Sequence, residues 1–108
     1  MAGNRKTFII GLDGASWDVL NPLIEHGVMP NLKRIVLEGV CGNLRSTIPP
    51  YTAPAWVSCV TGVNPGKHGV FGFTVKNNGV TGANPQFVES GSVNAPKLWN
   101  YINNTGRT

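Results

Sequence analysis

The stretch of residues 46–73 constrains the fold of this chain more than any other part of the sequence. Two consecutive prolines near its start favour an extended approach, because a residue before proline avoids the α region. Thr52 then has the position of a helix N-cap, and Pro54 falls in the first turn, where a missing N–H costs little. Residues 53–61 are small or apolar, so we expect a short buried helix that Gly62 ends.

Thr52 has two open interpretations at this point. Its hydroxyl is a common helix cap. It also lies where free backbone N–H groups and the helix dipole favour negative charge, which suits a residue that acts on an anionic group.

A second stretch ends in a carboxylate. The short apolar run 7–12 predicts a strand buried on both faces, as in a parallel sheet, and Asp13-Gly14 follows it directly. Asp13 would then stand at the carboxyl edge of the sheet, where open α/β sheets place their ligands. A carboxylate there suits a hard or borderline metal ion, although an Asp in this position can also cap the next helix.

The rest of the chain predicts alternating short elements. We expect one helix after a turn in residues 16–27, a second that begins at Pro30 and ends at Gly39, a strand over 40–48, an extended segment over 70–75, a loop or weak hairpin over 76–94, and a last helix from Pro96 to Gly106.

Composition and charge exclude several classes of protein. The chain has 108 residues, 41% of them hydrophobic and 13% charged, which is typical of a globular domain. Its apolar runs are far shorter than the roughly 20 residues of a membrane-spanning helix, and we see no signal peptide, so a cytoplasmic location is expected. The nine basic residues behind the net charge of +4 are scattered, so we expect no nucleic-acid partner.

Four other side chains are expected to have structural roles. Cys41 and Cys59 lack metal-binding spacing, and each is predicted to be a small core residue. Asp18 is predicted to cap a first turn and His26 to lie near a helix end, since neither has a second ligand at helical spacing.

Taken together, four motifs resemble the amino-terminal portion of the type I phosphodiesterase/nucleotide pyrophosphatase family, a branch of the alkaline phosphatase superfamily. The resemblance runs from about residue 7 to residue 106. The matching residues are Ile10-Gly11-Leu12-Asp13-Gly14, Met29-Pro30-Asn31-Leu32, Thr52-Ala53-Pro54-Ala55-Trp56, and the run from Val60 to Val70 that contains His68-Gly69.

The resemblance implies an α/β fold, an alkaline-phosphatase-like three-layer sandwich with a mainly parallel central sheet. It implies a metal-dependent hydrolase of small-molecule phosphoesters with two divalent metal ions, zinc being the expected metal. Asp13 would bind metal, and Thr52 would be both nucleophile and metal ligand. Metal coordination can activate a hydroxyl that is otherwise a poor nucleophile, and paired metals can clamp the attacking and leaving oxygens. The resemblance gives His68 a structural role and no metal role.

The departures from the family pattern concern specificity. Many nucleotide pyrophosphatases have a phosphate-binding Asn about twenty residues after the nucleophile, and the equivalent position here is Phe73, so Asn77 or Asn78 would have to replace it. Trp56 stands where sulfatases of the superfamily carry Arg, which argues against sulfate esters. The phosphoglycerate mutase branch uses a serine in place of Thr52.

The family's remaining metal ligands come from sequence beyond position 108. We therefore expect residues 1–108 to be the amino-terminal part of an incomplete phosphodiesterase domain, active only with the remainder of the parent chain. Two alternatives remain, a non-catalytic module that binds an anion at the helix beginning at Thr52, and an inactive fragment.

Overall fold

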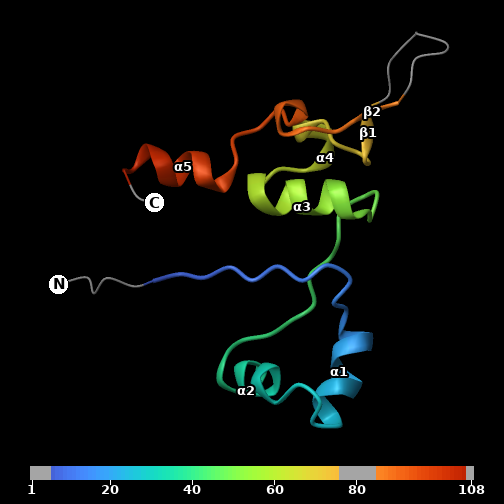
Figure 1. Ribbon diagram of the computed structural model, residues 1–108, viewed down its shortest axis with the longest axis vertical. Coiled ribbons are helices and arrows are strands. Elements are labelled where there is room, and N and C mark those ends of the chain that lie inside the picture. Colours follow the sequence, from blue (N-terminus) through green and yellow to red (C-terminus); the bar gives the residue numbers. More distant parts are fainter. Residues whose placement is uncertain (1–5, 76–84, 107–108) are drawn as a thin grey trace. The chain divides into compact units, whose positions relative to one another are not determined.

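The computed structural model describes residues 6–75 and 85–106, and the chain divides into two compact units, Met1–Asn43 and Leu44–Thr108 (Figure 1). We refer to them as the amino-terminal and carboxyl-terminal units and describe each by itself. Among the described residues, helices account for most of the regular structure. None of the helices in these ranges has the length and apolar character that crossing a bilayer requires.

The amino-terminal unit contains two helices of equal length, α1 (Trp17–Glu25) and α2 (Pro30–Glu38), which contact each other. Both were predicted, and their ends follow local signals. Gly27 takes a φ of +74° just after α1, and Pro30 occupies the start of α2, where its missing N–H is unimportant. The indole Nε1–H of Trp17 donates to the carbonyl of Gly42 at 3.2 Å, which ties the segment after α2 to the start of α1.

The two strands predicted for this part of the sequence are not formed within the described residues. Residues 7–12 and 40–48 have no ladder partner there, and their apolar side chains are exposed, with Ile10 at 81% and Val40 at 102%. A strand exists only through hydrogen bonds to a neighbour, so an apolar run alone cannot define one. The parallel sheet expected from these runs is therefore absent from the part of the chain that the structure describes.

The carboxyl-terminal unit is built around α3 (Thr52–Thr61) and the single-turn helix α4 (Pro65–His68), which lie side by side in Figure 1. Gly62 ends α3 in the left-handed conformation, with φ +72°. This confirms the predicted end of the helix. Asn64 caps α4, since its Oδ1 accepts the Lys67 backbone N–H at 3.1 Å.

A two-residue antiparallel pair, β1 (Thr74–Val75) and β2 (Gln86–Phe87), follows α4. It agrees with the weak hairpin predicted after residue 75, whereas the predicted extended segment 70–75 is a strand only at its end. The 3₁₀ turn η1 (Ser90–Ser92) and α5 (Leu98–Asn104) complete the unit. The last helix begins two residues later than predicted, because Lys97 is its N-cap and its N–H donates to Asn100 Oδ1 at 2.8 Å.

The core of the carboxyl-terminal unit is small and lies under the first turns of α3. Its fully buried side chains include His68, Val70 and Pro54. The predicted burial of the two cysteines is wrong, since Cys41 and Cys59 are both exposed. An apolar helix still has an exposed side, and in α3 Pro54 is the buried residue while Cys59 lies on the exposed side.

Candidate functional site

Thr52 is the first residue of α3 and not its cap. Tyr51 has the extended N-cap conformation, with φ −105° and ψ 155°, and its carbonyl accepts the Ala55 N–H at 3.0 Å. The Thr52 side chain is partly buried, and among the described residues its hydroxyl has no hydrogen-bond partner. The capping role considered from the sequence is thus wrong, and the hydroxyl remains available for other chemistry.

The approach to Thr52 is bent, not uniformly extended as predicted. The chain bends at Ile48 and Pro49, whose peptide bond is cis, and Thr47 Oγ1 donates to the Pro49 carbonyl across the bend at 2.8 Å. The chain is extended again at Tyr51, so it enters the helix from a short, internally bonded corner.

Backbone donors at the start of α3 are fewer than in an ordinary helix. Ala55 donates to Tyr51, and Pro54 has no N–H, so Thr52 and Ala53 supply the free donors of the first turn. Neither N–H has a backbone partner within the described residues. An anionic group beside the Thr52 hydroxyl would therefore meet two N–H donors and the positive end of the helix dipole.

A buried histidine lies beneath this turn. His68, in α4, has no solvent exposure, and its Nε2 lies 2.8 Å from the Oγ of Ser58 in α3. Its Nδ1 accepts the backbone N–H of Val70 at 3.1 Å. Since Nδ1 is an acceptor, the neutral ring carries its proton on Nε2, and that N–H donates to the serine hydroxyl.

Burial lowers the pKa of His68 below its ordinary value of 6.5, and a hydrogen bond to the backbone carbonyl of Pro54 acts in the opposite direction. The net direction is downward, so the imidazole is neutral at pH 7. The Nδ1 lone pair is used by Val70, so His68 is not arranged as a base that could activate Ser58.

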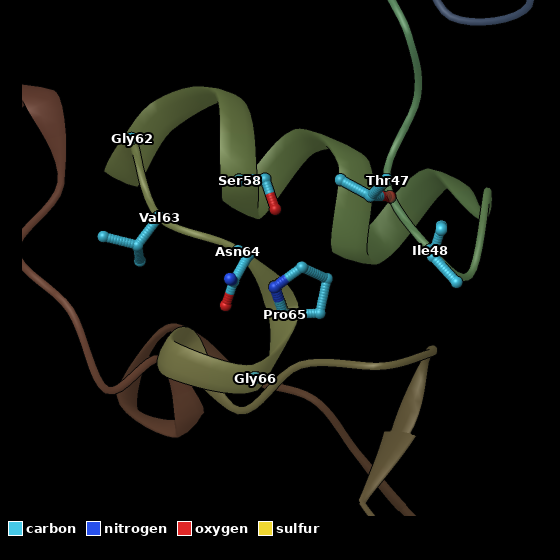
Figure 2. Close-up of a pocket in the computed structure, with 8 residues that line it drawn as sticks. All are labelled: Thr47, Ile48, Ser58, Gly62, Val63, Asn64, Pro65 and Gly66. Carbon is cyan, nitrogen blue, oxygen red and sulfur yellow. The ribbon is translucent and has the colours of Figure 1, made fainter.

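A broad pocket of about 650 Å³ opens beside Ser58, the hydrogen-bond partner of His68 (Figure 2). It is lined by Thr47 and Ile48 from the approach to α3, by Ser58, and by residues 62–66. Figure 2 shows the Ser58 hydroxyl pointing from α3 towards the turn that carries Asn64 and Pro65. Thr52 does not line this pocket, so the pocket is not built around the hydroxyl that the sequence singled out.

A second pocket, of about 450 Å³, lies on another side of α3 and is mostly apolar. Its walls include Ala53, Trp56 and Phe73 together with the side chains of Phe87 and Trp99. Phe73, which replaces the expected phosphate-binding Asn, thus shares a pocket with the neighbour of Thr52. Asn77 and Asn78, the proposed substitutes, lie outside the described residues.

Asp13 lies in the amino-terminal unit, whereas Thr52 lies in the carboxyl-terminal unit. Asp13 is exposed and precedes Gly14, whose φ of +70° makes a turn directly after the carboxylate. Within the described residues, no group of three or more His, Cys, Asp or Glu side chains gathers to hold a metal. Asp18 and His26 are both exposed. His26 lies at the end of α1, as predicted, whereas Asp18 lies in the first turn without capping it, because Ser16 is the N-cap and α1 has no side-chain cap hydrogen bond.

Sequence reasoning missed Ser58. The sequence shows it only as one small residue of an apolar helix, yet it is the partner of the only fully buried polar side chain in the described residues. Ser58 and His68 lie in different helices, ten residues apart, so no period within one element pairs them, and only the His68-Gly69 motif could have drawn attention to this pair.

Comparison with known proteins supports the resemblance seen in the sequence. The family model for type I phosphodiesterase/nucleotide pyrophosphatase matches residues 7–108. No curated protein and no solved structure matches the chain. The family implies an alkaline-phosphatase-like fold and phosphoester substrates, and its members typically use metal ions. Since the match spans nearly the whole sequence, the chain belongs to the type I phosphodiesterase/nucleotide pyrophosphatase family.

Proposed function

We propose that this chain contributes the nucleophile and one metal ligand to a metal-dependent phosphoester hydrolase, of the phosphodiesterase/pyrophosphatase type, that is active as part of a longer protein. Thr52 would be the nucleophile and Asp13 the metal ligand. The observation that carries the proposal is the state of the Thr52 hydroxyl. It lies at the start of α3 beside two free N–H groups and has no hydrogen-bond partner among the described residues.

The donors fit a divalent metal chemically but do not complete a site. Asp13 offers an exposed carboxylate and Thr52 a hydroxyl, both oxygen ligands of the kind that zinc and harder cations accept. Two ions, with zinc as the expected metal, would need further ligands beyond the described residues of this chain. When bound, the metal would supply a Lewis acid that lowers the pKa of the threonine hydroxyl.

The chain's own residues would then act on the phosphorus. Thr52 Oγ1 attacks, a bond from this oxygen to phosphorus forms, and the bond to the leaving-group oxygen breaks, while the hydroxyl proton passes to solvent. With a phosphodiester, the phosphorus on Thr52 keeps its second ester substituent; water attacks this intermediate in a second step, releases a phosphomonoester and restores the hydroxyl. The free N–H groups of Thr52 and Ala53 would donate to the non-bridging phosphoryl oxygens, whose charge grows in each transition state.

The test uses the protein that contains this chain and an aryl phosphodiester as substrate. We expect turnover that a chelator abolishes and that zinc restores. Rapid acid quenching followed by peptide mass spectrometry is expected to find on Thr52 a phosphoryl group that still carries the second ester substituent of the substrate. Asp13→Asn should lose most activity, and Asp18→Asn, an exposed carboxylate of the same unit, serves as the matched control and should retain it.

Turnover in a folded Thr52→Ala protein would contradict the nucleophilic role. Activity that survives exhaustive chelation would contradict the metal dependence. An anion that binds at the start of α3 without any turnover would favour a non-catalytic binding module instead.

A further inference from the structure

We propose that His68 is a positioning residue that fixes the first two turns of α3, and thereby the Thr52 hydroxyl, through its hydrogen bond to Ser58. This inference rests on the proposed nucleophilic role of Thr52. It concerns a side chain that would contact neither substrate nor metal.

The contacts of His68 reach three separate parts of the carboxyl-terminal unit. Its Nε2–H donates to Ser58 Oγ in the second turn of α3, and the carbonyl of Pro54, in the first turn, also faces the ring. Its Nδ1 accepts from Val70, and its own carbonyl accepts the Asn94 N–H at 3.0 Å. The imidazole therefore connects α3 with Val70, and the backbone carbonyl of the same residue extends the connection to Asn94.

The connection lies close to the candidate nucleophile. Pro54 and Ser58 are four residues apart, so they share one face of α3, and Pro54 follows Thr52 by two residues. Ser58 is about 9 Å along the helix axis from Thr52, at 1.5 Å per residue. Because His68 and Pro54 are both fully buried, a shift of the ring would be transmitted to the first turn through packed atoms.

Alternative roles for this pair fit the geometry less well. A serine nucleophile with a histidine base needs an unprotonated nitrogen facing the hydroxyl, but here the nitrogen facing Ser58 carries the proton. A metal ligand needs an accessible lone pair, but the Nδ1 lone pair of His68 accepts the Val70 N–H and the side chain is fully buried. What remains is a fixed donor that holds α3 in place.

Two substitutions of His68 separate the functions of its nitrogens. The amide of His68→Gln reaches the Nε2 position and can still donate to Ser58, whereas the shorter amide of His68→Asn reaches only the Nδ1 position. Ser58→Ala removes the other partner of the same bond. His26→Gln, at the other histidine of the chain, is the matched control because that side chain is exposed in the amino-terminal unit.

We expect His68→Asn and Ser58→Ala to lower kcat about 10- to 100-fold with KM nearly unchanged, since misplacing a reactive group acts on the chemical step. His68→Gln should recover most of the lost kcat, and the double variant Ser58→Ala/His68→Asn should be no worse than the poorer single one. Nitrogen NMR of the imidazole is expected to show the Nε2–H tautomer in the unsubstituted protein, a readout that does not depend on activity.

Unchanged kcat in folded Ser58→Ala, with an enzyme that still requires Thr52, would overturn the positioning role alone. Equal losses in His68→Asn and His68→Gln would also overturn it, because the Nε2 donor would then be irrelevant. If His68→Asn fails to fold, Ser58→Ala decides the question, since it truncates only a partly buried hydroxyl. Turnover that survives in Thr52→Ala would instead overturn the proposed function and this inference together.

Discussion

Replacing Thr52 by alanine should leave stability almost unchanged while abolishing activity. The hydroxyl has no hydrogen-bond partner within the described residues, so the substitution breaks no internal bond. Losing a partly buried methyl group costs about 0.4 kcal/mol, half the value for full burial. The better helix propensity of alanine offsets a similar amount. The free energy of unfolding should therefore change by less than about 0.5 kcal/mol.

Thr61, at the other end of α3, provides the matched control. Its Oγ1 donates to the Val57 carbonyl at 2.6 Å and accepts the Val63 N–H at 3.4 Å. Thr61→Ala loses the same methyl group and gains the same propensity, so the difference between the two variants isolates the hydrogen bonding. We expect Thr61→Ala to be less stable than Thr52→Ala by about 1 kcal/mol, the usual net value of such a bond.

The assay combines urea denaturation with hydrolysis of an aryl phosphodiester by the protein that contains this chain. Thr61→Ala should retain activity, and Thr52→Ala should lose it by on the order of 10⁴-fold or more, as when other covalent nucleophiles are removed. Two results would refute the reasoning. If Thr52→Ala is destabilised as much as Thr61→Ala, the hydroxyl is a cap after all; if it keeps its turnover, the hydroxyl is not the nucleophile.

Three further outcomes are expected. Gly62→Ala should lower the free energy of unfolding by about 1 kcal/mol, because φ is +72°; no further steric cost is expected, since no atom lies within 4 Å of the added Cβ. Gly72→Ala has the same open space without a positive φ, so the same urea titration should find it neutral or stabilising. The pKa of His68 lies below 6.5 in the folded protein, so on acidification the unfolded chain binds the proton first. The contribution of His68 to the free energy of unfolding should therefore be full above about pH 6.5 and should fall below it, by at most about 1.4 kcal/mol per pH unit. Denaturation series across pH should show this fall in the unsubstituted protein and a flatter profile in His68→Gln. The 108-residue chain by itself should bind zinc weakly in calorimetric titration, because Asp13 and Thr52 are too few ligands; tight binding that Asp13→Asn abolishes would show otherwise.

The sequence predicted the helices because their ends depend on neighbours a few residues away. Gly27 and Gly62 adopt positive φ just after α1 and α3, and Pro30 begins α2, as local capping rules require. The same rules failed by one residue at Thr52, since they favour threonine over tyrosine as a cap, whereas the bond from the Ala55 N–H to the Tyr51 carbonyl places the cap at Tyr51. The match of the family model to residues 7–108 agrees with motifs readable in the sequence.

Strands and burial could not be read in this way. Residues 7–12 are apolar enough for a buried strand, yet they have no ladder partner among the described residues, while the weaker segments Thr74–Val75 and Gln86–Phe87 pair with each other. Strand formation depends on a partner elsewhere in the chain, which local pattern does not specify.

The sequence by itself determined the family and the helix positions, because both rest on residue identity and short-range spacing. It also singled out Asp13 and Thr52 as candidate oxygen ligands, which stay a prediction. Only the tertiary structure decided that Ser58 pairs with His68, that this histidine is buried and neutral, and that Cys59 faces solvent. These properties depend on which face of α3 packs against α4. That choice is made by contacts between residues far apart in the sequence, where burial and hydrogen bonding are satisfied together.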